Sequence, residues 1–311
     1  MIRRIALLLV AAIPALLVYI SLVALPQSAL RPEYLPLTTS PEDVGLSFES
    51  FTVKPVDRDI TLAGWWIPAA NARATLVFVH GGGSHRNSRF FKSLEFYRAM
   101  VDQGVSVVAI ELRNHGDSGK DERGMQMGAT EKYDVLAAVD WAFQRTPELP
   151  IFLMGISMGG ASAIQAIYAG ADVRGLILLD SVLDTRDTMV TAGAASTGLP
   201  GALFLPSAWS AERFFGLPSG NETALARAIE LDTPILVMVD PADPVTRAVH
   251  SETLARRNPN ASLWRAPDIA PDHEEIAWRD YWGTHVAAFA VYPEQTIARV
   301  MHFIQEQETS L

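Results

Sequence analysis

The sequence predicts an α/β protein, with a mostly parallel central sheet, helices on both faces and a small cap insert. Three observations support this expectation. Short, almost continuously apolar runs alternate with segments of helical spacing along most of the chain. Glycine-rich or polar turns follow several of these runs, as they do where buried parallel strands end at one edge of a sheet. About 50 residues from Leu183 to Asp232 precede the next apolar run, far more than a bare crossover needs.

Each element is predicted from its local composition. Runs rich in β-branched residues favour strands, and apolar residues three and four positions apart favour helices. The expected strands are Ser47–Val56, Ile60–Pro68, Thr75–His80, Val105–Ile110, Ile151–Met154, Val173–Leu179, Ile235–Val239 and Leu263–Arg265. The expected helices are Phe90–Val101, Thr130–Gln144, Ala161–Ala169, Thr246–Arg257 and Pro293–Gln305.

Residues 1–30 are predicted to be a membrane anchor or a signal sequence. Arg3 and Arg4 precede an uncharged run from Ile5 to Ala29. About 20 apolar residues at 1.5 Å each span the roughly 30 Å hydrocarbon core of a bilayer. The run is longer than a typical signal-peptide core, and no good small-x-small cleavage site follows Ser21. An uncleaved anchor is therefore favoured over a cleaved signal and over a core helix.

The paired arginines favour a cytoplasmic N-terminus. The rest of the chain is then expected on the extracytoplasmic side, held at the membrane through the N-terminal helix, or secreted if the segment is cleaved. Residues 31–45 are predicted to be a linker, because the stretch that includes them is rich in proline. Residues 46–311 are predicted to form one domain, with the cap at about 184–232.

Composition excludes several other classes of protein. The chain has 311 residues, and its 49% hydrophobic content excludes a disordered protein. A net charge of −10 without a long Lys/Arg run argues against a nucleic-acid partner. There is no cysteine, which excludes disulfides and a cysteine nucleophile. No phosphate-binding glycine loop is present and no second histidine cluster accompanies His273, so neither a cofactor nor a metal is expected.

The residues that indicate chemistry begin at Gly155-Ile156-Ser157-Met158-Gly159, a G-x-S-x-G pattern between a strand and a small-residue helix. A sharp turn there exposes a serine hydroxyl, and the flanking glycines remove side chains that would collide. The hydroxyl needs a base to take its proton, and the base needs a carboxylate to orient it. Ser157 is therefore the predicted nucleophile.

The base and the acid are expected to follow the serine in the chain, the acid first. Of the seven histidines, three precede Ser157 and two lie inside predicted helices, which leaves His273 and His285. The candidate acids stand at or just after the ends of predicted strands. They are Asp180, Asp240 and Asp243.

Most of residues 50–306 resemble the α/β-hydrolase superfamily, in its esterase, lipase and serine aminopeptidase-like branch. The resemblance rests on ordered motifs: HGGG at His80–Gly83, RNHGDSG at Arg113–Gly119, the GISMGG turn, VDPADPVT at Val239–Thr246 and the closing segment that begins THVAAFAV. By position, the resemblance implies Ser157 as nucleophile, Asp243 as orienting acid and His285 as base. His273 is the rival base, and Asp180 and Asp240 are the rival acids.

The site also needs an oxyanion hole, with N–H donors aimed at the negative oxygen of a tetrahedral intermediate. One expected donor is the backbone N–H of Met158, the residue after the nucleophile. The other is expected from Gly82, with Gly83 as second choice, because a bare glycine backbone approaches substrate closely. His80 and His115 are expected to hold these loops rather than to act as bases.

These inferences predict a serine hydrolase that cleaves an ester or thioester of a small acyl-containing substrate through an acyl-enzyme. The cap aromatics are expected either to line an acyl pocket or to pack the cap on the sheet; they are Phe204, Trp209, Phe214 and Phe215. A competing hypothesis is an aminopeptidase-like serine peptidase, whose substrate amine would be held by Glu212, Glu222 or Glu230. A non-catalytic binding module and an acyltransferase are also compatible with this fold.

Overall fold

The architecture comes from a computed structural model, which describes residues 12–32 and 35–309. An eight-stranded sheet has the strand order β1-β2-β4-β3-β5-β6-β7-β8. The β1–β2 and β2–β4 pairs are antiparallel, and all other neighbours are parallel. The predicted α/β class with a mostly parallel sheet is confirmed. The strands are β1 (Glu49–Val53), β2 (Leu62–Ile67), β3 (Ala74–Val79), β4 (Val105–Ile110), β5 (Ile151–Ile156), β6 (Gly175–Leu179), β7 (Ile235–Val239) and β8 (Ala261–Arg265).

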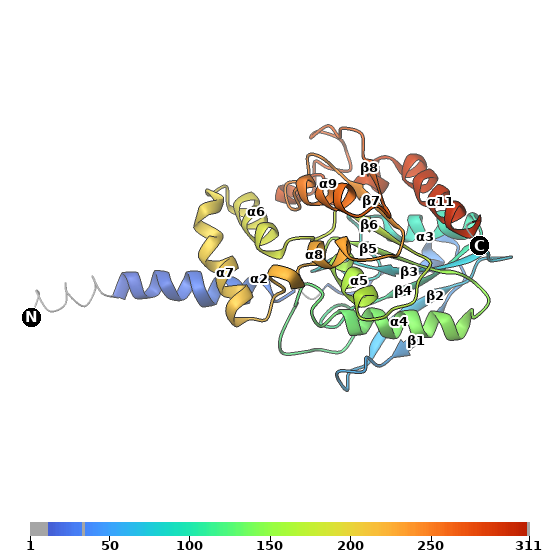
Figure 1. The fold of residues 1–311 in the computed structure, drawn as a ribbon, viewed down its shortest axis with the longest axis horizontal. Coiled ribbons are helices and arrows are strands. Elements are labelled where there is room, and N and C mark those ends of the chain that lie inside the picture. Colours follow the sequence, from blue (N-terminus) through green and yellow to red (C-terminus); the bar gives the residue numbers. More distant parts are fainter. Residues whose placement is uncertain (1–11, 33–34, 310–311) are drawn as a thin grey trace, which may run out of the picture.

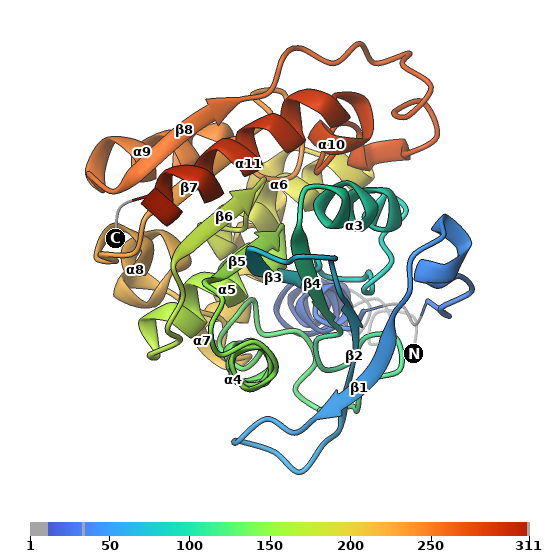
Figure 2. The ribbon, with the colours of Figure 1, turned by 90° about the vertical axis from the view of Figure 1, so that its right-hand side faces the viewer.

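Helices cover both faces of this sheet (Figure 2). One face is covered by α4 (Lys132–Arg145), α5 (Met158–Tyr168) and α8 (Ala224–Ile229). The other face is covered by α3 (Ser93–Asp102), α10 (Ala288–Val291) and α11 (Pro293–Thr309). Helix α9 (Ala248–Arg257) packs beside β7 and β8.

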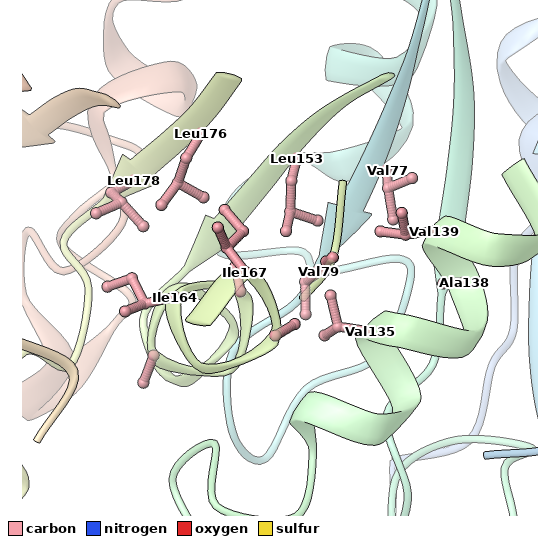
Figure 3. Close-up of a cluster of buried hydrophobic side chains, with 14 of the residues drawn as sticks. Val77, Val79, Val135, Ala138, Val139, Leu153, Ile164, Ile167, Leu176 and Leu178 are labelled. Atoms are coloured by element: carbon pink, nitrogen blue, oxygen red, sulfur yellow. The ribbon is translucent and has the colours of Figure 1, made fainter. Parts of the chain in front are cut away.

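The central strands are almost entirely apolar because both faces are covered. Successive residues of a strand point to opposite faces of the sheet. Val77 and Val79 of β3 join the cluster under α4 and α5, together with Leu153 of β5 (Figure 3). Leu76 and Phe78 point the other way, into the cluster under α3 and α11. This double burial explains why the bounds of β3 to β7 lie within two residues of the predicted ones.

Helix starts differ from the predicted ones where a turn intervenes. Helix α3 begins at Ser93 rather than at Phe90, because Lys92 adopts a left-handed conformation with a φ of 57°. Helix α5 begins already at Met158, because the turn at Ser157 leads directly into it. Ser157 is therefore the single residue between the end of β5 and the start of α5.

The insert between β6 and β7, residues 184–232, is called the cap insert below. It contains α6 (Thr185–Thr197), α7 (Leu205–Phe214) and α8. The Asp184 carboxylate accepts the N–H of Asp187 and so caps α6, and Gly198 with a φ of 69° ends that helix. Because α6 follows soon after the carboxyl end of β6, the insert is rooted at the edge where the parallel strands end.

An N-terminal helix, Ala12–Ala29, projects from the molecule beside α7 (Figure 1). Its mean hydropathy is 1.7 and only 6% of it is buried, so by length and composition it is a candidate membrane span. The part of the predicted anchor that precedes Ala12 lies outside the described residues. The helix is π-helical over Ile20–Ala24 and ends with α2 (Leu25–Ala29).

The last turns of this helix pack on the cap insert. Pro26 has no N–H to donate to the Leu22 carbonyl four residues earlier. The Ser210 hydroxyl of α7 donates to that carbonyl at 2.5 Å. Leu30, which is buried, packs against Ala211 and Leu217 of the cap insert. The N-terminal helix and α7 therefore form one packed unit.

Candidate functional site

Ser157 lies on the turn between β5 and α5, at the carboxyl edge of the sheet. Its φ of 51° and ψ of −122° form a combination that L residues rarely adopt. Two glycines permit this turn. A Cβ atom on Gly155 would lie 2.4 Å from the Gly159 carbonyl oxygen, and one on Gly159 would lie 2.2 Å from the Val79 carbonyl oxygen. The strained turn leaves the Ser157 side chain only half-buried at the end of the strand.

Ser157, His285 and Asp243 form one hydrogen-bonded chain. Ser157 Oγ lies 2.9 Å from His285 Nε2, and His285 Nδ1 lies 2.7 Å from Asp243 Oδ2. Asp243 follows β7, and His285 lies in the loop that leads to α10. The fold therefore brings together the three side chains that the resemblance implied, from positions far apart in the sequence.

The chemistry of the partners sets the direction of these hydrogen bonds. An ionised carboxylate only accepts, so His285 Nδ1 carries the proton donated to Asp243. His285 Nε2 is then the acceptor for the Ser157 hydroxyl, which is the direction that proton removal requires. Asp243 also accepts the N–H of Val245 at 2.7 Å and the hydroxyl of Thr246 at 2.6 Å. These donors help to fix the orientation of the carboxylate that His285 contacts.

Asp180, one of the rival acids, ties two loops together beside this chain. Its Oδ1 accepts the N–H of Asp240 at 2.8 Å, and its Oδ2 accepts the N–H of Val286 at 2.9 Å. Burial, and next the nearby charge of Asp243, raise the pKa of Asp180 well above the ordinary carboxyl range. Asp180 thereby connects the loop after β7 to the residue that follows His285.

The second rival acid and the rival base are engaged elsewhere. Asp240 accepts the N–H of Ala242 at 2.9 Å, and burial raises the pKa of its carboxyl group. His273 accepts the N–H of Glu275 at 3.1 Å, within the loop that follows β8. Among the described residues, the ring nitrogens of His285 bind only Ser157 and Asp243.

Two residues that hold the His285 loop were not predicted from the sequence. The ring of Trp282 stacks on the ring of His285, with centroids 5.8 Å apart and planes 25° apart. Arg279, which is buried, donates to the carbonyls of His285 at 3.2 Å and Phe90 at 2.6 Å. Burial lowers the pKa of Arg279 to about 10, so the guanidinium stays charged at neutral pH. Trp282 was detectable by its place three residues before His285, but no local pattern pairs Arg279 with Phe90.

The glycine loop after β3 passes close to the start of α5. A Cβ atom on Gly82 would lie 3.3 Å from the sulfur of Met158 and 3.0 Å from that of Met125. The N–H of Gly83 donates to His115 Nε2 at 3.0 Å. Of the two glycines expected to donate in the oxyanion hole, Gly83 therefore already donates its N–H to a protein acceptor.

Two buried histidines hold this loop. His80 Nε2 accepts the N–H of Leu112 at 3.1 Å, and burial lowers the pKa of His80 well below its ordinary value. Nδ1 of His115 donates to the Arg113 carbonyl at 2.8 Å, and burial lowers the pKa of His115 to about 4. Both rings are neutral at pH 7, and the neutral form of His115 is the one that accepts from Gly83.

Three atoms of the kinds that bind metals lie within 4.8 Å of one another beside the serine. Each comes from one side chain: Asp180, Asp243 or His285. Hydrogen bonds of 2.7 to 2.9 Å already engage all three side chains. A cation there would compete with the bonds that orient His285. The cluster therefore fits a hydrogen-bonded relay better than a coordination site.

This strand order, with a serine on the turn after β5 and a histidine and an aspartate brought to it, defines the class of protein. The chain has the α/β-hydrolase fold, and part of its sequence is similar to members of that superfamily. The family described as "Serine aminopeptidase, S33" matches residues 70–215. That range includes Ser157 but ends before Asp243 and His285.

Curated relatives of this chain are named as lipases. The lysophosphatidylserine lipase of Gallus gallus is 28% identical over 182 residues, which are 50% of this chain and 42% of that protein. The monoglyceride lipase of Homo sapiens is 32% identical over 120 residues, 38% of each chain. The chain thus spans less than half the length of these relatives.

Solved structures share the fold over a longer range. An esterase of Pyrococcus furiosus gives a TM-score of 0.71 at 22% identity, covering 89% of this chain and 97% of that one. An acylaminoacyl peptidase of Pyrococcus horikoshii gives a TM-score of 0.58 at 16% identity, covering 84% of this chain and 42% of that one. At these identities the structures establish the common fold.

Proposed function

We propose that this chain is a serine carboxylic ester hydrolase for a lipid-type ester. The observation that carries the proposal is the hydrogen-bonded chain from Ser157 through His285 to Asp243, with its proton directions. The lipases and esterases among the similar proteins support ester hydrolysis as the chemistry. A non-catalytic binding module would have no need to keep all three groups in contact.

In the proposed mechanism, Ser157 Oγ attacks the ester carbonyl while His285 Nε2 takes its proton. His285 then gives this proton to the leaving alkoxide, and the acyl group stays on Ser157. A water molecule, deprotonated by the same ring, attacks the acyl-enzyme and releases the acid. Asp243 keeps the ring in the tautomer that aims Nε2 at the serine and stabilises the positive charge that the ring gains.

The N–H groups of Gly82 and Met158 are assigned to the negative oxygen of the tetrahedral intermediate. Met158 is the first residue of α5, where N–H groups lack helical partners and the helix dipole favours negative charge. The close approach of Gly82 to Met158 supports this pair over Gly83. Loss of one such donor costs other hydrolases about 2.7–4 kcal/mol of transition-state stabilisation.

An aminopeptidase needs a carboxylate for the free amine of its substrate, and the candidate carboxylates of the cap insert have other partners. Their pairing favours ester hydrolysis, although the matching family is described as an aminopeptidase family. Glu212 pairs with Arg186, Glu222 lies 3.7 Å from Arg227, and Glu230 accepts the Tyr168 hydroxyl at 3.3 Å.

The N-terminal helix is proposed to anchor the chain in a membrane, with the hydrolase domain on the extracytoplasmic side. The length and hydropathy of the helix, and Arg3 and Arg4 before it, support this topology. The hydrogen bond from Ser210 to Leu22 favours an uncleaved anchor over a signal peptide. Cleavage would remove one partner of a contact that the folded cap insert makes.

Ester specificity can be tested with the full-length chain in nanodiscs. The substrates are p-nitrophenyl esters from acetate to palmitate, the thioester of the best acyl group, and leucine p-nitroanilide. If the acyl chain is buried, each added pair of methylenes stabilises the transition state by about 1.6 kcal/mol, or roughly fifteen-fold in kcat/KM. We expect this rise over the shorter chains and turnover of the anilide far below that of the esters.

The Ser157→Ala variant, purified in the same way, corrects for contaminating esterases. Faster turnover of leucine p-nitroanilide than of every ester would assign the site to peptides instead. A thioester hydrolysed more efficiently than the matching oxygen ester would change the leaving group of the proposal but leave the acyl specificity in place.

A further inference from the structure

Part of the cap insert carries large apolar side chains on its surface. Five of them lie within residues 199–214 and are 46% to 64% exposed; they are Leu199, Leu203, Leu205, Trp209 and Phe214. The rings of Trp209 and Phe214 meet edge to face, with centroids 5.6 Å apart. These five residues are called the cap face below. Exposed apolar side chains that follow one another so closely along the chain indicate an interaction surface.

Residues 188–211, which hold four of these five side chains, carry no formal charge. Between Asp187 and Glu212 the chain has no Asp, Glu, Lys or Arg, although 19% of the whole chain is charged. Glu212, at one end of the stretch, pairs with Arg186, just before the other end. Residues 188–211 of the α6–α7 hairpin can therefore leave water without the large cost of desolvating an ion.

The cap face lies beside the N-terminal helix. Ser210 of α7 donates to the Leu22 carbonyl, and Ala211 packs against Leu30. Figure 1 shows the helix continuing past α7, away from the sheet. The uncharged N-terminal run extends to Ala29, seven residues or about 10 Å beyond Leu22. Helix α7 therefore lies beside the uncharged part of the N-terminal helix and not beyond the end of that part.

We propose that the cap face is immersed in the lipid leaflet that the N-terminal helix enters, so that acyl chains cover it. This inference rests on the anchoring proposed above. Arg213 supports a position near the headgroups, because its guanidinium lies 5.6 Å from the ring centre of Phe214. Leucine and aromatic side chains beside a cationic group are typical of segments at the boundary between acyl chains and headgroups.

Immersion of the cap face also gives an acyl substrate a short route to the site. The hairpin is rooted at the serine turn, since the N–H of Val182 donates to the Ser157 carbonyl at 3.0 Å and α6 begins three residues later. An acyl chain that leaves the leaflet along the hairpin passes the uncharged residues 188–211 while its ester group approaches Ser157. The structure thus favours substrates that are presented by a bilayer.

The absence of cysteine allows a direct test, because a single introduced cysteine is then the only labelled site. Full-length Leu203→Cys and Phe214→Cys variants carry a nitroxide in phosphatidylcholine nanodiscs. Phe143→Cys on α4 is the matched control, because the Phe143 side chain is 58% exposed and lies on the hydrolase domain. Leu17→Cys, where the side chain is also 58% exposed, reports on the N-terminal helix. Ester turnover checks that each variant is folded.

The measurement is power-saturation EPR with oxygen, which concentrates in lipid, and with a neutral nickel chelate, which stays in water. Labels at positions 203, 214 and 17 are expected to collide more often with oxygen than with the chelate. The label at position 143 is expected to show the reverse ratio.

Three results would overturn the inference. Labels at 203 and 214 that match the control at 143, while the label at 17 is in lipid, place the cap face in water and leave the anchor intact. Labels shielded from both reagents, with dipolar broadening that disappears on dilution with unlabelled chain, show that a second copy covers the face. A water-exposed label at 17 removes the anchor and the inference with it. Because EPR accessibility does not depend on turnover, these failures are distinguishable from failure of the proposed ester hydrolysis.

Discussion

Replacing Ser157 with alanine is expected to lower kcat for ester hydrolysis by a factor of about 10⁶. The hydroxyl oxygen is the atom proposed to bond to the acyl group, and without it His285 has only water to activate. The fold should be unchanged, because the backbone and the flanking glycines set the turn. The measurement is steady-state hydrolysis of the best ester by the full-length chain in nanodiscs, with circular dichroism as the check on folding.

Ser181 is the matched control for this substitution. It is a buried serine that follows β6 and touches the serine turn, because a Cβ atom on Gly160 would lie 1.9 Å from its hydroxyl oxygen. Ser181→Ala removes a neighbouring hydroxyl without removing the proposed nucleophile, so it should keep most of the turnover. Full activity of Ser157→Ala, or equal losses in both variants, would show that Ser157 is not the nucleophile.

Replacing His285 with alanine is expected to lower kcat by about the same factor of 10⁶. Its Nε2 atom is the acceptor 2.9 Å from the Ser157 hydroxyl, and Asp243 cannot take this role because it faces Nδ1. The double variant Ser157→Ala/His285→Ala should lose little more than either single variant, because the two groups act as one unit. Steady-state kinetics of the three variants on one ester test this expectation.

His273→Ala is the matched control, because His273 is the other histidine in the loop region between β8 and α11. Its ring accepts the N–H of Glu275, so its loss should disturb only that loop. A severe loss in His273→Ala together with a mild one in His285→Ala would transfer the role of base to His273 and contradict the proposed geometry.

The sheet and the serine turn were predictable from local sequence for a physical reason. Strands β3 to β7 are buried on both faces, so each appears in the sequence as an apolar run bounded by polar or glycine residues. The glycines around Ser157 are required by atoms close to them, so their spacing is visible within a few residues. The predictions that depend on such short-range contacts agree with the structure to within a few residues.

The choice of acid and base depends on long-range chain paths. His273 and His285 share a loop region of similar composition, and only the fold determines which ring meets Ser157. The contacts of Asp180 join it to Asp240 and Val286, 60 and 106 positions away. No sequence pattern of a few residues encodes such contacts, and motif order alone had left Asp180 as a rival acid.

The roles of the cap residues were equally open at the level of sequence. An aromatic residue in an insert serves equally to fill a pocket, to pack the insert or to meet an external partner. The structure places Phe204 against Gly193 and Phe215 against the Leu30 cluster, whereas Trp209 and Phe214 are exposed. These different surroundings arise because α7 packs along the N-terminal helix, a contact between segments almost 190 residues apart.

The most direct test of the central claim is fluorophosphonate labelling of the full-length chain, with the adduct mapped by mass spectrometry. The reagent phosphonylates a serine whose proton is removed by a base and whose developing negative charge is stabilised by nearby donors. We expect a single adduct, on Ser157, that is lost in His285→Ala and kept in His273→Ala. No adduct in folded protein, or an adduct on another serine, would contradict the proposed serine hydrolase.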